Sequence, residues 1–168
     1  MKNNKGFTLI ELLATISLLA VLMLIAVPNV IGVVNRNKNN TYIEDAKKLV
    51  SLAEYKIRSN SDWKPTTVGT SKCIYMDDLD REDFDSTAPN GGTYMFDKSY
   101  VKATRVEDGK ITYKVVLVEN KYPSEKDGAK QDTEFIGIIT ETDSARLYDD
   151  EISGLISSTD NVDSISCS

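Results

Sequence analysis

An uncharged apolar segment near the N-terminus constrains this chain more than any other feature. Residues 12–34 form 23 consecutive positions without Asp, Glu, Lys or Arg. About 20 helical residues cross the hydrocarbon core of a bilayer, so the segment is long enough to span one. A secretory signal has an apolar core of about 7 to 15 residues and a small-residue cleavage site after it, which this sequence lacks. The segment therefore predicts a retained spanning helix rather than a secretory signal or a buried core helix.

Glu11 is an acid at the edge of this apolar segment. A carboxylate at membrane depth costs about 3 kcal/mol and usually has a partner. The preceding base, Lys5, is six positions away and lies beyond one helical turn. If the chain were cut after Gly6, the new α-amine of Phe7 would lie four residues from Glu11, and the same amine of a neighbouring copy could approach it. The charge is therefore consistent with an assembly of identical helices.

The segment K-G-F-T-L-I-E at residues 5–11, followed by an apolar run that contains Pro28, resembles the class III signal of type IV pilins and pseudopilins. The resemblance implies that a prepilin peptidase cleaves between Gly6 and Phe7 and that the amine of Phe7 is methylated. It implies that Glu11 neutralises the Phe7 amine of an adjacent subunit during assembly. Pro28 is expected to take part in assembly as well, either as a kink in the helix or as a point where the helix melts within the filament. Two opposite charges shielded from water are far more stable paired than apart.

The same resemblance implies an α+β architecture, the type IV pilin fold. In this fold a long N-terminal helix with an apolar first half packs on a small antiparallel sheet. The expected segments are a leader peptide at 1–6, a transmembrane or filament-core helix at 7–34, an amphipathic second half of the helix at 35–60, and a globular head at 61–168.

The resemblance also implies where the chain is found and what it meets. Before assembly it would cross the cytoplasmic membrane once with its N-terminus inside, and after assembly it would lie in a cell-surface pilus. Lys2 and Lys5 precede the apolar segment and Arg36 and Lys38 follow it, so the positive-inside rule alone does not choose the orientation. The implied partners are other copies of the chain, related pilins, a prepilin peptidase, a pilus assembly platform and, before assembly, the membrane.

After the apolar segment, the sequence continues as an amphipathic helix. Apolar residues recur at spacings of 4, 3, 4 and 4, which is typical of one helix face: Tyr42, Ala46, Leu49, Ala53 and Ile57. Together with the apolar segment they predict one helix from Phe7 to about Ser59, with its second half against the head. Trp63, just beyond the helix, is expected to cap the core between helix and sheet.

The head is predicted to consist mainly of β-strands. Alternating β-branched and aromatic residues predict strands at 93–106, 110–119 and 133–140. Asp108-Gly109 predicts a hairpin turn between the first two strands. A polar loop is expected at 121–132, a short helix at 143–156, and a Ser/Asp-rich tail beyond it. Three tyrosines in the strands are expected to lie in the core or on the sheet surface: Tyr94, Tyr100 and Tyr113.

Cys73 and Cys167 are the two cysteines of the chain. Two cysteines in an exported domain suggest a disulfide. This bond would tie the C-terminus to the loop after the helix and stabilise the head by about 2 to 4 kcal/mol. Two buried or free thiols are the alternative.

Six acids between Asp77 and Asp85 raise the question of a calcium site. Asp78 and Asp80 fit the EF-hand template, but Asp83 stands where this loop needs Gly, and Pro89 stands where it needs Glu. A solvated acidic loop is therefore favoured, and neither a metal nor any other cofactor is expected.

Composition argues against catalysis and nucleic-acid binding. The chain has no His, the commonest general base, and no G-x-S-x-G, Walker or H-E-x-x-H motif. Residues 61–168 contain 12 Lys and Arg against 22 Asp and Glu, and an acidic head repels phosphate backbones. Neither an enzyme nor a nucleic-acid partner is predicted.

These features predict the structural subunit of a type IV pilus that serves adhesion, motility or surface attachment. One alternative is a pseudopilin of a secretion or DNA-uptake machine. Another is a membrane-anchored binding module that never polymerises, which leaves Glu11 unexplained. The mature N-terminus and the state of assembly separate these possibilities.

Overall fold

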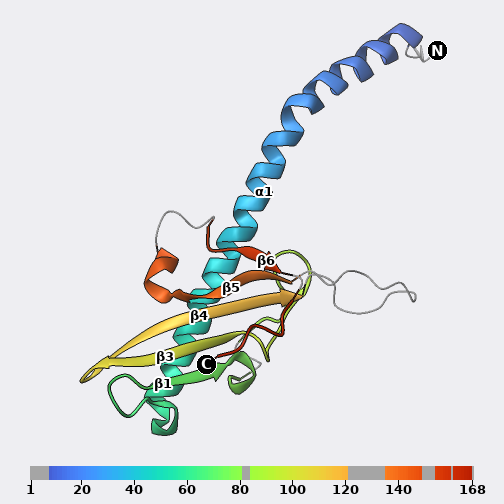
Figure 1. Ribbon diagram of the computed structural model, residues 1–168. Coiled ribbons are helices and arrows are strands. Elements are labelled where there is room, and N and C mark those ends of the chain that lie inside the picture. Colours follow the sequence, from blue (N-terminus) through green and yellow to red (C-terminus); the bar gives the residue numbers. More distant parts are fainter. Residues whose placement is uncertain (1–7, 81–83, 121–134, 149–153, 160, 168) are drawn as a thin grey trace, which may run out of the picture. The chain divides into compact units, whose positions relative to one another are not determined.

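The computed structural model describes residues 8–80, 84–120, 135–148, 154–159 and 161–167. The chain divides into two compact units, Met1–Asn37 and Lys38–Ser168. Helix α1 (Leu9–Ser59) supplies the described helix of the first unit and continues into the second. The second unit combines this part of α1 with an antiparallel sheet (Figure 1). The predicted α+β fold, one long helix with an apolar first half and a small antiparallel sheet, is confirmed.

Within the described residues the sheet has six strands: β1 (Ser71–Tyr75), β2 (Thr93–Tyr94), β3 (Tyr100–Glu107), β4 (Lys110–Asn120), β5 (Phe135–Asp143) and β6 (Ser157–Thr159). Their order is β1-β3-β4-β5-β6, and β2 pairs with the end of β4. Short 3₁₀ helices flank the strands: η1 (Ser61–Trp63), η2 (Met76–Asp78) and η4 (Ser144–Tyr148). The long strand β4 lies at the centre of the sheet.

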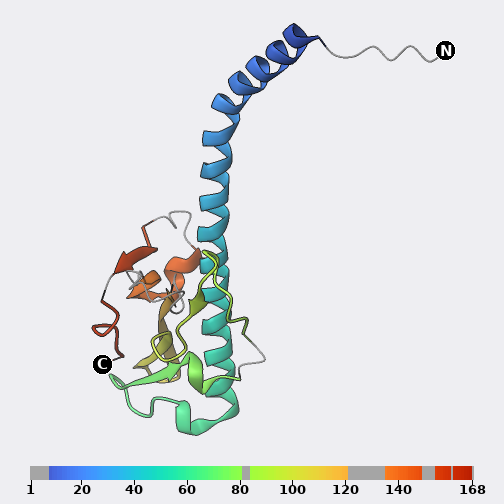
Figure 2. The same ribbon diagram turned by 90° about the vertical axis from the view of Figure 1, so that its right-hand side faces the viewer.

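The second half of α1 covers one face of the sheet (Figure 2). The five apolar residues of the predicted helix face are all buried, with exposures of 5% or less: Tyr42, Ala46, Leu49, Ala53 and Ile57. Ala46 and Ala53 have small side chains, which lets the helix backbone approach the strands closely. The predicted helical stripe and its packing against the head are therefore confirmed.

Strand β4 contributes to two cores, one on each face of the sheet. Val115 and Leu117 belong to the cluster that contains the buried face of α1. Val116 and Val118 belong to a second cluster, which includes Ile165 of the C-terminal segment. Successive side chains of a strand point to opposite faces, so a run of apolar residues is what a strand covered on both faces requires.

The hairpin between β3 and β4 has the predicted turn. Glu107 pairs with Lys110, which leaves Asp108 and Gly109 as the two loop residues. Gly109 has a φ of +80°, a backbone conformation that residues other than glycine rarely adopt.

The aromatic residues lie where the sequence places them. Tyr94 and Tyr100 are buried, and Tyr113 is half-buried against the helix-side core. Trp63 packs at the edge of the same core, and its ring lies 4.6 Å from the Lys56 ammonium. Trp63 therefore caps the contact between helix and sheet, as predicted.

The structure corrects several predicted boundaries in the head. The predicted strand 93–106 is divided into β2 and β3 by a turn in which the N–H groups of Lys98 and Ser99 donate to the Met95 carbonyl. Strands β1 and β6 were not predicted. Their residues join the sheet through backbone hydrogen bonds, and their sequences show no clear alternation of apolar and polar side chains. Within the predicted helix 143–156, the described helix is the 3₁₀ turn η4. The predicted loop 121–132 lies outside the described residues.

A polar contact ties α1 to the segment around β2. The Tyr94 hydroxyl donates to Asp45 Oδ2 at 2.6 Å. Nearby, the Asn90 side-chain amide donates to the Tyr42 hydroxyl at 3.0 Å. Burial raises the pKa of Asp45, although the Tyr94 bond and the Lys48 charge act in the opposite direction. Helix and sheet are thus joined by a specific bond as well as by apolar packing.

Replacement of Tyr94 by Phe is expected to lower the free energy of unfolding by about 2 kcal/mol, because a half-buried carboxylate loses its donor. Urea unfolding of the full chain in detergent, followed by the fluorescence of Trp63, measures the change. Tyr55→Phe removes the same hydroxyl from a side chain that is 72% exposed and serves as the control. Equal losses in the two variants would show that the Asp45 bond contributes nothing.

Asp45→Asn is expected to change how stability depends on pH. Burial raises the pKa of Asp45 above its ordinary value of 3.8, so the folded state holds this proton more tightly than the unfolded state. The stability that Asp45 contributes is therefore complete below pH 3.8 and is lost as the pH rises through the raised pKa. The stability of the wild type minus that of Asp45→Asn, from urea midpoints across this range, should fall with rising pH. A difference that rises with pH would mean that Tyr94 and Lys48 outweigh burial.

Candidate assembly site

Glu11 lies in the first turn of α1 and forms a capping box with Thr8. The Thr8 N–H donates to Glu11 Oε2 at 2.8 Å, and the Thr8 hydroxyl donates to the same oxygen at 2.9 Å. The Glu11 N–H donates to Thr8 Oγ1 at 3.3 Å. These bonds use N–H groups at the helix start that have no acceptor within the helix. Thr8 was not among the predicted site residues, although a Thr three residues before a Glu at the start of an apolar run is the signature of a capping box.

The capping box gives the Glu11 carboxylate hydrogen bonds but no opposite charge. Its donors are a backbone N–H and a hydroxyl, which are neutral and leave the negative charge in place. Gly6 and Phe7, the predicted cleavage and methylation residues, lie outside the described residues. The predicted pairing of Glu11 with a Phe7 amine therefore stays a prediction.

Exposed apolar side chains cover α1 along residues 9–34. The large ones are all at least 44% exposed, on a helix that is long and apolar enough to cross a membrane. The hydroxyls within this segment are satisfied locally: Thr15 donates to the Leu12 carbonyl at 2.8 Å, and Ser17 donates to the Leu13 carbonyl at 2.8 Å. Such bonds allow hydroxyl groups to lie in surroundings without water.

The helix continues through Pro28 and Gly32 without a break. Pro28 has no N–H to donate to the Leu24 carbonyl, so one backbone hydrogen bond of the helix is missing there. A Cβ added at Gly32 would meet nothing within 4 Å, so contacts within the chain do not require glycine. Both residues weaken the helix locally, and the assembly role of Pro28 stays a prediction.

A disulfide between Cys73 of β1 and Cys167 ties the C-terminal segment to the sheet. The two Cα atoms are 6.1 Å apart, and the residues are separated by 94 positions. Beside the bond, the Cys167 N–H donates to the Tyr75 hydroxyl at 3.4 Å. The Tyr100 hydroxyl lies 3.3 Å from the Ser166 carbonyl and donates to it. The bond thus holds the C-terminal segment over the face of the sheet that α1 leaves uncovered.

The double variant Cys73→Ser/Cys167→Ser is expected to lose about 2 to 4 kcal/mol of unfolding free energy, because the cross-link restricts a long loop in the unfolded chain. Urea unfolding of the full chain with and without dithiothreitol measures this loss. The reductant should shift the midpoint of the wild type toward that of the variant and leave the variant unchanged. A wild-type midpoint that ignores the reductant, although the thiols are shown to be free, would contradict the expectation.

Asp78 and Asp85 of the acidic segment 77–85 bind backbone N–H groups through their carboxylates. The Tyr75 N–H donates to Asp78 Oδ2 at 2.9 Å, and the Thr87 N–H donates to Asp85 Oδ1 at 2.8 Å. The second bond lowers the pKa of Asp85. In the described part of the chain, which omits 81–83 of this segment, no group of three or more His, Cys, Asp or Glu residues is placed to hold a metal ion.

Comparison with known proteins identifies the N-terminal segment. Residues 1–27 match the family model described as the prokaryotic N-terminal methylation motif. This match covers the predicted cleavage and methylation residues together with Glu11. Searches of curated proteins and of solved structures found no match.

Proposed function

We propose that this chain, whose N-terminal methylation motif indicates a type IV pilin-like or pseudopilin precursor, is the structural subunit of a type IV pilus. A prepilin peptidase removes residues 1–6, and the amine of Phe7 is methylated. The chain then polymerises through its apolar helix. The observation that carries the proposal is the combination of Glu11 in the first helical turn with an apolar helix surface that is exposed along residues 9–34.

Electrostatics supports pairing between subunits. Glu11 has donors within its own chain, but these are neutral. In lipid or among packed apolar helices, an uncompensated carboxylate is costly, whereas an adjacent ammonium group offsets that cost. A Phe7 amine on a neighbouring subunit would supply the opposite charge at the depth of Glu11 and fix the axial register. The proposed partners are accordingly other copies of the chain and related pilins, with a peptidase and an assembly platform acting before them.

In this proposal, three segments of the mature chain have separate roles. Residues 7–34 form the membrane anchor before assembly and the filament core afterwards, and 35–60 carry the helix into the head at 61–168. The proposed location is the cytoplasmic membrane, with the N-terminus inside, followed by a cell-surface pilus. For the head we propose a structural role at the filament surface and no enzymatic activity.

A pseudopilin of a secretion or DNA-uptake machine is the second candidate. The N-terminal methylation motif fits both kinds of subunit and does not choose between them. Filament length and location in the native cell distinguish them: a pilin is found in fibres that can be sheared from the cell surface, and a pseudopilin stays with the envelope.

The mature N-terminus gives the first test. Mass spectrometry of the protein from native cells is expected to show a chain that begins at Phe7, with a methyl group on its amine. A chain that still begins at Met1 would contradict the processing step and favour an anchored module that does not polymerise.

Two variants separate the charge of Glu11 from its capping role. Glu11→Gln keeps a side chain that can complete the capping box but removes the charge, and Thr8→Val removes the cap but keeps the charge. We expect Glu11→Gln to be inserted and cleaved yet to reduce the sheared-filament fraction at least about tenfold, as expected when one partner of a shielded charge pair is removed. Thr8→Val should assemble to within about twofold of the wild type, because a cap contributes only about 1 kcal/mol. Equal filament yields from Glu11→Gln and the wild type would overturn the pairing mechanism.

A further inference from the structure

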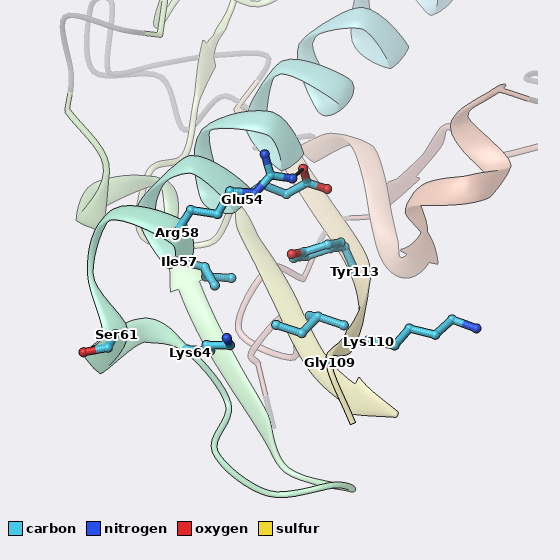
Figure 3. Close-up of a pocket in the computed structure, with 9 residues that line it drawn as sticks. Glu54, Ile57, Arg58, Ser61, Lys64, Gly109, Lys110 and Tyr113 are labelled. Atoms are coloured by element: carbon cyan, nitrogen blue, oxygen red, sulfur yellow. Dashed lines mark hydrogen bonds and ion pairs between the residues drawn. The ribbon is translucent and has the colours of Figure 1, made fainter. Parts of the chain in front are cut away.

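A groove of about 680 Å³ lies in the head between the last turns of α1 and the β3–β4 hairpin (Figure 3). Its apolar floor consists of Ile57 of the helix and of two side chains of β4, Ile111 and Tyr113. Ile57 is buried, whereas the two β4 side chains are only half-buried and stay partly open to the groove. Binding sites for small molecules have volumes of about 300 to 1,000 Å³, so this groove has the size of such a site.

Charged side chains surround the apolar floor. Arg58 and Glu54 line the groove and form an ion pair at 3.2 Å. Lys64 and Lys110 line it as well, and within the described residues no ion pair joins either lysine to an acid. Three cations thus stand against one acid, although residues 61–168 contain 12 Lys and Arg against 22 Asp and Glu. The groove has the opposite charge to the head that carries it.

Arg105 holds the two walls of the groove together. Its guanidinium donates to the Pro65 carbonyl at 3.3 Å and to the Thr66 carbonyl at 3.0 Å, in the segment directly after Lys64. It also donates to Asp108 Oδ1 at 3.0 Å, in the turn of the β3–β4 hairpin. The segment after η1 is thereby tied to the hairpin, so the groove is already formed before a ligand enters. A pre-formed site pays less ordering entropy when it binds.

The polar groups of the rim suit a ligand with several hydroxyls. Glu54 offers acceptor oxygens, Arg58 offers N–H donors, and the Ser61 hydroxyl can do both. Burial raises the pKa of Tyr113, and the Glu54 charge acts in the same direction, so the Tyr113 hydroxyl keeps its proton and can donate. A pyranose ring has hydroxyls that donate and accept at its edge and C–H groups on its faces. Such a ring matches an apolar floor inside a polar rim.

We propose that this groove binds an acidic saccharide, with one face of a sugar ring against Tyr113 and the two isoleucines and its carboxylate facing Lys64 and Lys110. The choice of an acidic over a neutral saccharide rests on charge complementarity, because the groove gathers unpaired lysines in a head that is acidic elsewhere. This inference goes beyond the proposed function, since it gives the head a ligand and does not depend on assembly.

Two other kinds of anion fit the groove less well. A nucleic acid carries its phosphates well beyond a groove of this size, where the acidic surface of the head repels them. An acidic peptide can bring carboxylates to Lys64 and Lys110, but its flexible backbone offers no rigid ring with a flat apolar face for Tyr113. Charge alone would therefore leave the floor of the groove without a partner.

Isothermal titration calorimetry of the full chain in a non-ionic detergent at low salt tests the proposal. The acidic probes are trigalacturonate and a hyaluronan tetrasaccharide, and the methyl ester of trigalacturonate keeps every ring but removes the charge. We expect saturable binding of an acidic probe and, for trigalacturonate, an affinity at least about tenfold above that of its methyl ester, as charge-assisted hydrogen bonds imply. Equal affinities for the acid and its ester would overturn the proposal, as would a lack of binding by both acidic probes.

Single variants locate the binding within the head. Lys64→Gln and Lys110→Gln should each lower the affinity for the acidic probe about fivefold to tenfold. Lys114→Gln is the matched control, because this lysine follows Tyr113 on β4, points to the opposite face of the sheet and has a side chain that is 51% exposed. Its affinity should stay within about twofold of the wild type. An equal loss in Lys114→Gln would show that the acid is attracted by surface charge in general, and the groove assignment would be wrong.

A peptide control separates a saccharide site from a simple anion site. An acetylated and amidated triaspartate has the same charge as trigalacturonate but no sugar ring, and we expect it to bind at least about tenfold more weakly. Equal binding of the peptide and the saccharide would show that the groove recognises charge alone, which contradicts the proposal. All of these titrations use the unassembled chain, so their failure leaves the proposed function untouched, and a failure of filament assembly leaves this inference untouched.

Discussion

The apolar surface of α1 along residues 9–34 requires a cover that the described part of this chain does not provide. Its large side chains are at least 44% exposed and occupy all sides of the helix, so one packed layer could not bury them. Two environments cover a helix on every side: a lipid bilayer and a bundle of similar helices. Apolar surroundings alone supply no opposite charge for Glu11, so a neighbouring helix would have to carry one. The proposed passage from membrane to filament would satisfy this constraint, and in that proposal Glu11 selects a neighbour that brings an amine.

Beyond Lys38 the apolar residues of the same helix are distributed differently around its axis. Only one face is apolar there, and that face is buried against the sheet while charged residues occupy the others. The second unit has its own cores on both faces of the sheet, and the Cys73–Cys167 bond holds the C-terminal segment over the outer one. Its internal contacts therefore do not depend on what surrounds residues 9–34. A subunit that exchanges lipid for neighbouring helices requires such independence.

In the proposed assembly, charge would add a direction that apolar contacts alone leave undefined. Apolar burial contributes most of the association energy but tolerates shifts in register and orientation. Charged groups contribute less energy and far more specificity. In the proposed assembly, Glu11 at the start of α1 would fix the axial position of a subunit within the helix core.

The sequence by itself determined the features that depend on local pattern. Length and apolarity predict the spanning segment, the spacing from Tyr42 to Ile57 predicts the buried helix face, and Asp108-Gly109 predicts the hairpin, because in each case neighbouring residues carry the physical cause. The tertiary structure decided what depends on distant partners. Strands β1 and β6 form through backbone pairing with β3 and β5, and their side chains do not alternate between apolar and polar in a way that would predict a strand. Arg58, Lys64 and Lys110 line one groove, and only the packing of the β3–β4 hairpin beside α1 brings these residues together.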